Sequence, residues 1–338
     1  MSDQPNVIIR RQGRIGRITL NRPKALNALD LTMIRTISQA LVNWRNNASV
    51  HAVVLDAAGG RAFCAGGDIR ALRAWAVEGD TVSVERFFAE EYAVNLAIAR
   101  FPKPYISLID GICMGGGIGL SVHGTVRVAT EAAVFAMPET GIGLFPDVGA
   151  TFALPRLRGN YGMYLALTGD RVGGADATRI GLATHFVPQS ALAGLADRLA
   201  EDGPAVLAEA TLPPPLGTLP QVEAFAADTV PGILAALAAN PTEWARATLE
   251  TLRRVSPSAL LWTFAAMRRG ATLTLEQALA AELALTRHVT RHPDFAEGVR
   301  AMVVDKDRTP HWSPPRLEDV DPAAIARMLD LTPEKAGS

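Results

Sequence analysis

Two acidic residues, Glu139 and Asp147, stand eight positions apart in the segment MPETGIGLFPDVG, which is otherwise apolar and rich in glycine. Each acid directly follows a proline, and the restricted backbone of proline favours a defined placement of the carboxylate. Apolar surroundings destabilise a charged carboxylate, so its pKa rises toward neutrality and suits general acid–base catalysis. The segment is therefore a candidate catalytic site. The residue types leave a second interpretation equally open, in which one acid caps a helix and the other pairs with Arg156 or Arg158.

Two glycine-rich segments, CAGGD at 64–68 and MGGGIG at 114–119, each follow a predicted strand and precede a predicted helix. Glycine leaves the backbone bare, so a ligand can approach closely and N–H groups can point outward. Two such turns from neighbouring units could each aim one N–H at a single oxygen, as an oxyanion hole requires. The same arrangement would also hold a phosphate, and tight packing of strand against helix is the structural alternative for a single turn.

The second glycine segment departs from three better known motifs. A dinucleotide-binding fingerprint needs glycine where Leu120 or Val122 stands, and no GK[ST] follows to complete a phosphate-binding loop. The stretch GLSVHG resembles a nucleophile elbow, but His123 occupies the position of its last glycine. We therefore expect Ser121 to be a helix residue and His123 to be structural.

The hydrophobic pattern predicts the order strand, glycine turn and helix twice. The first unit joins a strand in HAVVLDA to a helix in IRALRAWAVEG, and the second joins a strand in PYISLID to a helix in IGLSVHG. Two strands around Gln12-Gly13 and a helix from Leu31 to Trp44, capped by Asp30, come before them. Two short strands, in VRVAT and AVFAMPE, come after them. We therefore expect repeated β-β-α units and a largely parallel sheet.

The last third of the chain has a different character, because strand-like runs stop. TLPPPLGTLP, at 211–220, is a predicted linker, since consecutive prolines cannot continue a helix. Beyond it, N-caps at Ser256 and Thr274 predict the starts of two helices. We predict a β-β-α core at 1–205 and a mainly helical region at 206–338.

The composition narrows the class of protein. The chain has 338 residues, of which 49% are apolar, and a net charge of −1, so a large globular protein without a nucleic-acid partner is expected. Its two cysteines, Cys64 and Cys113, form no CxxC motif, so we expect neither a disulfide framework nor a zinc site. The sequence shows no secretion signal and no long uncharged apolar run, so we expect no membrane span and a cytoplasmic protein.

Together these motifs resemble the crotonase, or enoyl-CoA hydratase/isomerase, superfamily. The matching segments, in chain order, are LNRPKALNALD, AFCAGGDI, DGICMGGGIGLSVHG and FAMPETGIGLFPDVGATFALPRL. Parts of the last two are similar to the signatures of the 3-hydroxyisobutyryl-CoA hydrolase branch, as is the distant run HPDFAEGVRAMVVDKDRTPHWSP. The resemblance implies a crotonase-like α/β spiral of repeated β-β-α units with a helical C-terminal region, and an acyl-CoA site in the core.

The resemblance also implies roles for single residues. The main-chain amides of Gly67 and Gly116 would form an oxyanion hole for the thioester oxygen. Coenzyme A would lie along RPKALN, near Lys24 and Leu26, and Arg70 would reach a phosphate. The other expected substrate contacts are Ala65, Asp68, Gly115 and Pro138.

One departure from the hydratases of the superfamily points to hydrolysis. Those enzymes carry a glutamate where this chain has Gly119, whereas their second glutamate corresponds to Glu139. Asp147 stands where they commonly have glycine, which is the pattern of the hydrolase branch. We therefore expect hydrolysis of a short 3-hydroxyacyl-CoA, above all 3-hydroxyisobutyryl-CoA in valine catabolism. Glu139 would activate water or attack directly, and Asp147 would bind the 3-hydroxyl group or assist the leaving thiolate.

Three alternatives stay open at this point. They are a hydratase or isomerase acting on a short acyl-CoA, a non-catalytic protein that binds CoA, and a serine hydrolase built on Ser121. We expect no metal and no separate cofactor, because coenzyme A is part of the substrate. A homo-oligomer is compatible with the helical C-terminal region, and the acyl group is left open.

Overall fold

The structure of the protein is a computed structural model that describes residues 5–215, 217 and 219–329. The chain divides into two compact units, and each is assembled from three separate segments. Unit 1 comprises Met1–Asp68, Glu90–Ala136 and Arg171–Leu219, and unit 2 comprises Ile69–Ala89, Met137–Asp170 and Pro220–Ser338. The predicted domain boundary between residues 205 and 206 stays a prediction. The two compact units are divided at other positions of the chain.

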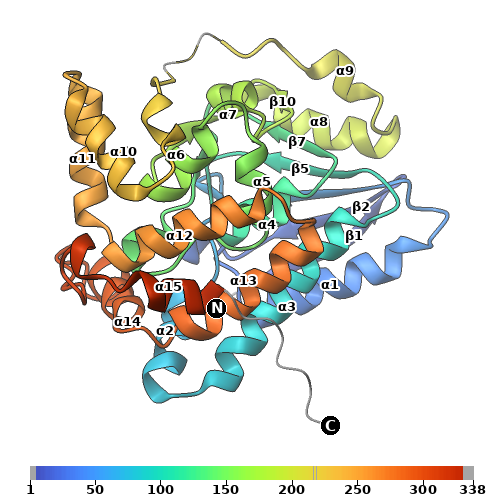
Figure 1. The fold of residues 1–338 in the computed structure, drawn as a ribbon. Helices are drawn as coiled ribbons and strands as arrows, with labels where there is room; N and C mark the ends of the chain where they lie inside the picture. The colour runs from blue at the N-terminus through green and yellow to red at the C-terminus, as the bar shows by residue number, and fades with distance from the viewer. Residues whose placement is uncertain (1–4, 216, 218, 330–338) are drawn as a thin grey trace. The chain divides into compact units, whose positions relative to one another are not determined.

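A six-stranded sheet forms the larger layer of unit 1 (Figure 1). Its strands, in spatial order, are β1 (Val7–Gln12), β2 (Ile15–Leu20), β3 (Ala52–Ala57), β5 (Tyr105–Ile109), β7 (Val126–Ala129) and β10 (His185–Phe186). The first pair, which the sequence predicted as two strands around Gln12-Gly13, is antiparallel, and the remaining neighbours are parallel. Strand β5 is buried along its whole length and β3 over its first four residues, which is typical of parallel strands covered on both faces.

A second, smaller sheet of unit 1 was not expected as a separate layer. It consists of β4 (Ala62–Cys64), β6 (Ile112–Met114), β8 (Val134–Ala136) and β9 (Val172–Gly173), and the first three are parallel. The consecutive strand pairs β3/β4, β5/β6 and β7/β8 each send their first strand to the large sheet and their second to the small one, whereas β1 and β2 both belong to the large sheet. Gly111 makes one of these transitions, with a φ of 74° and no room for a β-carbon, which would lie 2.5 Å from Arg61 O. The largely parallel sheet is therefore two sheets.

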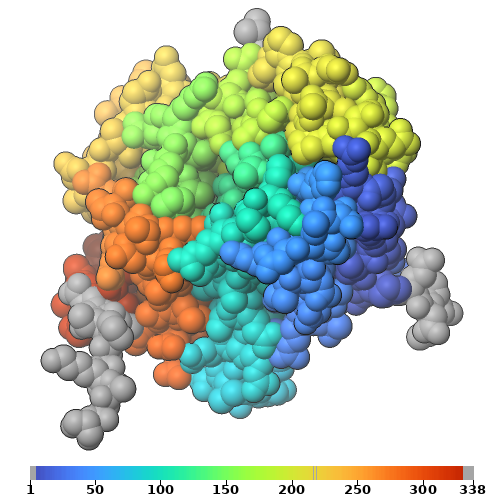
Figure 2. Space-filling model, turned by 90° about the vertical axis from the view of Figure 1, so that its right-hand side faces the viewer, coloured from blue at the N-terminus to red at the C-terminus, as the bar shows by residue number. Residues whose placement is uncertain are grey.

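Helices complete unit 1. Helix α1 (Leu31–Arg45) starts at Asp30, whose carboxylate accepts a hydrogen bond from Met33 N, as predicted. Helices α8 (Gln189–Glu201) and α9 (Val206–Ala210) bury leucine, alanine and valine side chains against β2, β3, β5 and β7. Figure 2 shows this yellow-green to yellow segment beside the blue N-terminal strands, where Arg14 N donates to Ala200 O. The short helices α4 (Gly116–Val122) and α7 (Gly174–Ile180) follow β6 and β9.

The long helix α3 (Thr81–Ala99), absent from the sequence prediction, contains the boundary between the two units. Unit 2 is mainly helical. Its elements are α2 (Ile69–Glu78), η2 (Glu139–Ile142), α5 (Ala150–Ala153), η3 (Leu154–Arg156), α6 (Tyr161–Thr168), η4 (Glu223–Ala226), α10 (Val230–Ala239), α11 (Glu243–Arg254), α12 (Pro257–Gly270), α13 (Leu275–Val289), α14 (Pro293–Val299), the π-helix η5 (Arg300–Val304), η6 (Leu317–Asp319) and α15 (Pro322–Leu329). The predicted N-caps Ser256 and Thr274 open α12 and α13. Within the described ranges, no helix combines the length and apolar character needed to cross a membrane.

Candidate active site

The ends of β4 and β6 bring the two glycine-rich turns together in unit 1. The strands pair in parallel with Cys64 beside Cys113, so both turns leave the same edge of the small sheet. A β-carbon built on Gly116 would lie 3.4 Å from Gly67 N. Among the described residues, no backbone carbonyl accepts a hydrogen bond from either the Gly67 or the Gly116 amide. Two free N–H groups so close together can donate to one ligand oxygen, which is the geometry of an oxyanion hole.

The segment RPKALN, predicted to lie along coenzyme A, is hydrogen-bonded to the first glycine turn. Ala65 N donates to Leu26 O at 3.0 Å, and the Arg22 guanidinium pairs with the Asp68 carboxylate at 3.0 Å. Leu26 itself has a positive φ of 51°, so the loop is tightly bent. Lys24 is exposed at its surface. The structure therefore groups these predicted substrate contacts around the turn that carries Gly67.

Glu139 begins η2 in unit 2, and its side chain is only 6% exposed. The backbone of this turn is held by the C-terminal helices. Ser256 N, at the start of α12, donates to Thr140 O at 3.2 Å. A β-carbon on Gly143 would lie 2.4 Å from the carbonyl of Asp294 on α14, so the two backbones are in direct contact. The turn that carries Glu139 is therefore packed on both helices.

Asp294 belongs to the run HPDFAEGVRAMVVDKDRTPHWSP and connects α14 to α12 and to Ser313 through hydrogen bonds. Its carboxylate is fully buried and accepts hydrogen bonds from the Ser256 hydroxyl at 2.5 Å and from Ser313 N at 2.7 Å. The Trp262 indole, also fully buried, donates to Leu144 O at 3.1 Å, just beyond η2. A buried carboxylate with two donors is a strong local anchor, because its charge is stabilised by both hydrogen bonds.

Asp147 lies in unit 2 at the end of the same segment, and it is 5% exposed. Val148 and Gly149, which follow it, both have positive φ values of 55° and 80°. The turn therefore bends sharply just after the acid. The pKa of Glu282 on α13 is raised to about 8, mainly by burial, and the nearby charge of Asp147 contributes to this rise.

Glu91 on α3 is an acid that the sequence analysis missed. It is 3% exposed, and its Oε1 lies 2.4 Å from the point at which a Gly116 β-carbon would sit. Asn95, one turn later on the same helix face, is fully buried, and neither of its amide atoms has a hydrogen-bond partner among the described residues. No clear signal in the sequence indicated this burial, because polar and apolar residues are mixed around the helix.

The predicted site residues fall into two groups. Unit 1 holds Lys24, Leu26, Ala65, Gly67, Asp68, Gly115 and Gly116, and unit 2 holds Arg70, Pro138, Glu139 and Asp147. The Arg70 guanidinium donates to Val303 O at 2.6 Å, so part of its hydrogen-bonding capacity is used within unit 2.

The alternative nucleophiles are unsuited to attack. The Ser121 side chain is buried in α4, and its hydroxyl donates to Gly117 O and Ile118 O, each at 3.0 Å. The thiols of Cys64 and Cys113 are also buried, and burial raises the pKa of Cys64 to about 12. Among the described residues, no group of three or more His, Cys, Asp or Glu side chains is placed to hold a metal ion.

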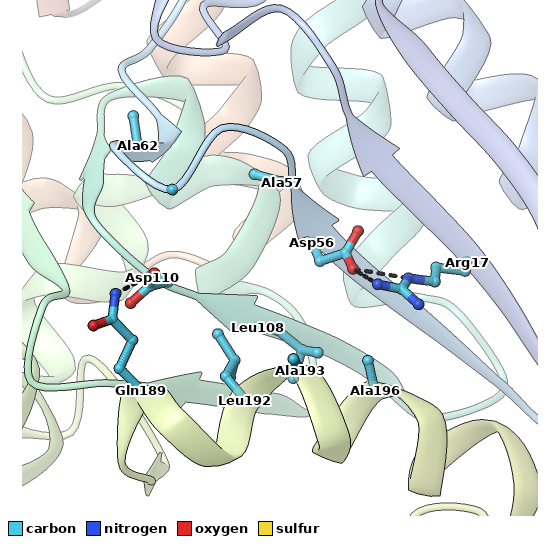
Figure 3. A pocket seen from close by; sticks show the side chains of 11 residues that line it. Arg17, Asp56, Ala57, Ala62, Leu108, Asp110, Gln189, Leu192, Ala193 and Ala196 are labelled. Carbon is cyan, nitrogen blue, oxygen red and sulfur yellow. Dashed lines mark hydrogen bonds and ion pairs between the residues drawn. The ribbon is translucent and has the colours of Figure 1, made fainter.

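A cavity of about 270 Å³ in unit 1 lies elsewhere, between the large sheet and α8 (Figure 3). Its polar side chains already bind one another: Arg17 pairs with Asp56 at 2.5 Å, and Gln189 donates to Asp110 at 2.9 Å. None of the predicted site residues lines it. Nothing in this cavity indicates a ligand.

Several known proteins are similar to this chain over most of its length. A family model described as enoyl-CoA hydratase/isomerase matches residues 15–329. The mitochondrial 3-hydroxyisobutyryl-CoA hydrolase of Rattus norvegicus is 45% identical, with 94% of this chain and 87% of that protein aligned. The enzyme of the same name from Homo sapiens is 43% identical, with 93% and 86% aligned.

Two solved structures are also similar over nearly the whole chain. A carnitinyl-CoA dehydratase from Mycobacterium thermoresistibile has a TM-score of 0.93 and 39% identity, with 98% of each chain covered. An enoyl-CoA hydratase from Rhodobacter sphaeroides 2.4.1 has a TM-score of 0.89 and 40% identity, with 96% of this chain and 97% of that chain covered.

The predicted cytoplasmic compartment is wrong by this comparison. The curated 3-hydroxyisobutyryl-CoA hydrolases that match this chain carry the description mitochondrial, including those of rat, frog and human. The prediction rested on the lack of a recognisable secretion signal, which is a weak basis for choosing among compartments inside a cell.

Proposed function

The chain belongs to the enoyl-CoA hydratase/isomerase family, and from this premise we propose that it hydrolyses 3-hydroxyisobutyryl-CoA to 3-hydroxyisobutyrate and coenzyme A. The family confirms the predicted crotonase-like α/β fold with a helical C-terminal region. The hydrolases among its relatives carry this activity in their names. The observation that supports the proposal most directly is the pair of unoccupied amides at Gly67 and Gly116.

In the proposed reaction, the thioester oxygen accepts hydrogen bonds from both amides. Negative charge develops on that oxygen as the carbonyl carbon is attacked, and each donor would lower the barrier by about 3 kcal/mol. The C–S bond then breaks, and the thiolate of coenzyme A leaves and takes up a proton. Neither amide needs to reorganise during the reaction, because the parallel pairing of β4 and β6 fixes both turns.

Glu139 supplies the attack in this proposal. It either removes a proton from water or forms a mixed anhydride that water then cleaves. Strands β6 and β8 pair in parallel with Met114 opposite Ala136, so the turns after both strands start at one edge of the small sheet. Glu139 follows Ala136 by three residues, a distance of at most about 11 Å along the chain. Chain connectivity therefore supports a role for Glu139 beside the same thioester.

Asp147 would bind the 3-hydroxyl group or assist protonation of the leaving thiolate. Its low exposure suits either role, because a buried carboxylate interacts strongly with a polar group at hydrogen-bonding distance where little water screens it. A hydroxyacyl substrate also explains why an acid stands at 147 rather than the glycine common in hydratases. A role of the protein in valine breakdown is proposed on the same grounds as this substrate. Coenzyme A would enter as part of the substrate, with no separate cofactor, and a homo-oligomer stays a prediction.

Hydration or dehydration of an acyl-CoA is the second candidate, because both similar solved structures are named for such activities. Gly119 argues against it. The residue is buried in α4 and has no side chain at the position that resembles the first hydratase glutamate. Hydration needs two carboxylates around one water, whereas hydrolysis of a thioester does not.

Thiol release from a panel of short acyl-CoAs separates the two candidates. We expect free thiol from 3-hydroxyisobutyryl-CoA, with a kcat/KM at least ten times that for butyryl-CoA, which lacks the hydroxyl group. Crotonyl-CoA serves as the hydratase substrate, with loss of its conjugated double bond as the signal. Rapid loss of that signal without thiol release would contradict the proposal.

A further inference from the structure

A buried carboxylate from the C-terminal helices binds the segment that carries Asp147. Glu282, on α13, is 2% exposed, and within the described residues it forms no ion pair. Its Oε2 accepts a hydrogen bond from Gly149 N at 2.7 Å. Its Oε1 accepts hydrogen bonds from Thr151 N at 3.1 Å and from the Thr151 hydroxyl at 2.5 Å. All three donors therefore come from one short turn, 149–151, rather than from α13 itself.

The turn that these hydrogen bonds hold is strained. Val148 has a φ of 55°, and the left-handed region is unfavourable for a β-branched residue. It is also buried, so it cannot relax into solvent. Residues in such conformations persist only where their surroundings hold them, and they concentrate at functional sites. The strain lies directly between Asp147 and the first donor to Glu282.

The charge of Asp147 acts on Glu282. The pKa of Glu282 is raised to about 8, mainly by burial; the hydrogen bond from the Thr151 hydroxyl opposes this rise and the charge of Asp147 adds to it. Among the described residues, Arg269 of α12 lines a small cavity together with Glu282, and its guanidinium donates to Leu329 O.

We propose that Glu282 is a positioning residue for Asp147: its carboxyl group holds the left-handed turn at 148–149 and so fixes the direction in which Asp147 meets the substrate. This inference rests on the proposed function, in which Asp147 contacts the hydroxyacyl thioester. It assigns the C-terminal helical region a part in the reaction, because α13 supplies the anchor. A misplaced catalytic group loses rate on the order of 100-fold for a shift of about 1 Å.

The test combines kinetics with backbone exchange. Glu282→Gln keeps the shape of the side chain but replaces one acceptor oxygen with an NH₂ group, which cannot accept from the turn. We expect kcat for 3-hydroxyisobutyryl-CoA to fall 10- to 100-fold with KM within about threefold, and amide exchange at 147–153 to accelerate at least tenfold. Thr151→Val, which removes one of the three donors, should give a smaller loss. Thr286→Val on α13, whose hydroxyl donates to Leu283 O of its own helix, is the matched control and should leave both unchanged.

A double-mutant cycle with Asp147→Asn shows whether Glu282 acts through Asp147. In the Asp147→Asn background, Glu282→Gln should lower kcat by less than about twofold, because there is no longer a carboxylate to position. A full further loss in that background, or wild-type kcat and exchange in Glu282→Gln, would overturn the positioning role alone. Wild-type kcat in Asp147→Asn would overturn both this role and the proposed use of Asp147.

Discussion

A β-carbon on Gly116 would lie 2.4 Å from Glu91 Oε1, so these two residues leave no room for a side chain between them. The same β-carbon would lie 3.4 Å from Gly67 N. Gly116 therefore keeps open the space in which the two amides meet. This space is bounded by a buried carboxylate on one side and by a main-chain donor on the other.

Gly116→Ala should lower kcat/KM for thiol release by about 100-fold, because the methyl group displaces Glu91 and crowds the oxygen held by the two amides. Circular dichroism should show an unchanged fold. Gly194→Ala is the control, since nothing lies within 4 Å of a β-carbon there and Gly194 is in helix α8. It should keep full activity and gain roughly 0.5–1 kcal/mol of stability. Equal activity of the two variants would mean that the Gly116 turn does not contact the thioester.

Asp294→Asn should destabilise the protein by about 1–3 kcal/mol, because one of its two donors, Ser256 Oγ or Ser313 N, would then face an amide NH₂ group. The free energy of unfolding in urea measures this loss. Activity should fall too, since α14 packs directly against the turn that carries Glu139. A variant as stable as the wild type would show that this buried network does not support the turn.

Glu282 should make stability depend on pH. Its pKa is raised from an ordinary value of 4.5 to about 8 in the folded protein, so the folded state retains a proton that the unfolded state has lost. The free energy of unfolding contributed by this group is therefore highest below about pH 4.5 and falls as pH rises toward 8. Urea titrations from pH 5 to 8 should show a flatter profile for Glu282→Gln than for the wild type. Parallel profiles would mean that Glu282 is already ionised in the folded protein at pH 5.

The two thiols should be inert in the native protein. Burial raises the pKa of Cys64 to about 12 and that of Cys113 well above its ordinary value, so thiolate is scarce at neutral pH. Iodoacetamide at pH 7.5 should label neither cysteine without denaturant, and activity should persist. Rapid native labelling together with loss of thiol release would implicate a cysteine in the reaction.

Local sequence signals predicted most of the fold near the site. Asp30, Ser256 and Thr274 cap helices as their spacing indicated, because capping depends on nearest neighbours. The pattern did not reveal that the pairs β3/β4, β5/β6 and β7/β8 divide their strands between two sheets, since this depends on close backbone approaches such as Gly111 against Arg61. Helix α3 was missed because its polar and apolar residues are mixed around its circumference.

The candidate site shows the same limit. The proximity of the two glycine turns could be predicted, because both turns follow neighbouring parallel strands, and the role of their amides as an oxyanion hole stays a prediction. Glu91 and Glu282 could not, because each is an acid inside a long helical pattern, where a solvent-exposed position is the usual expectation. Their burial beside Gly116 and the 149–151 turn depends on contacts between residues far apart in sequence.

Glu139→Gln tests the central claim most directly, because the amide keeps the size of the side chain but can neither accept a proton from water nor attack a thioester. Thiol release from 3-hydroxyisobutyryl-CoA should fall by about 10²- to 10⁴-fold, with unchanged circular dichroism and a similar KM. Turnover within a few-fold of the wild type would contradict the account, since no other carboxylate is assigned to the attack.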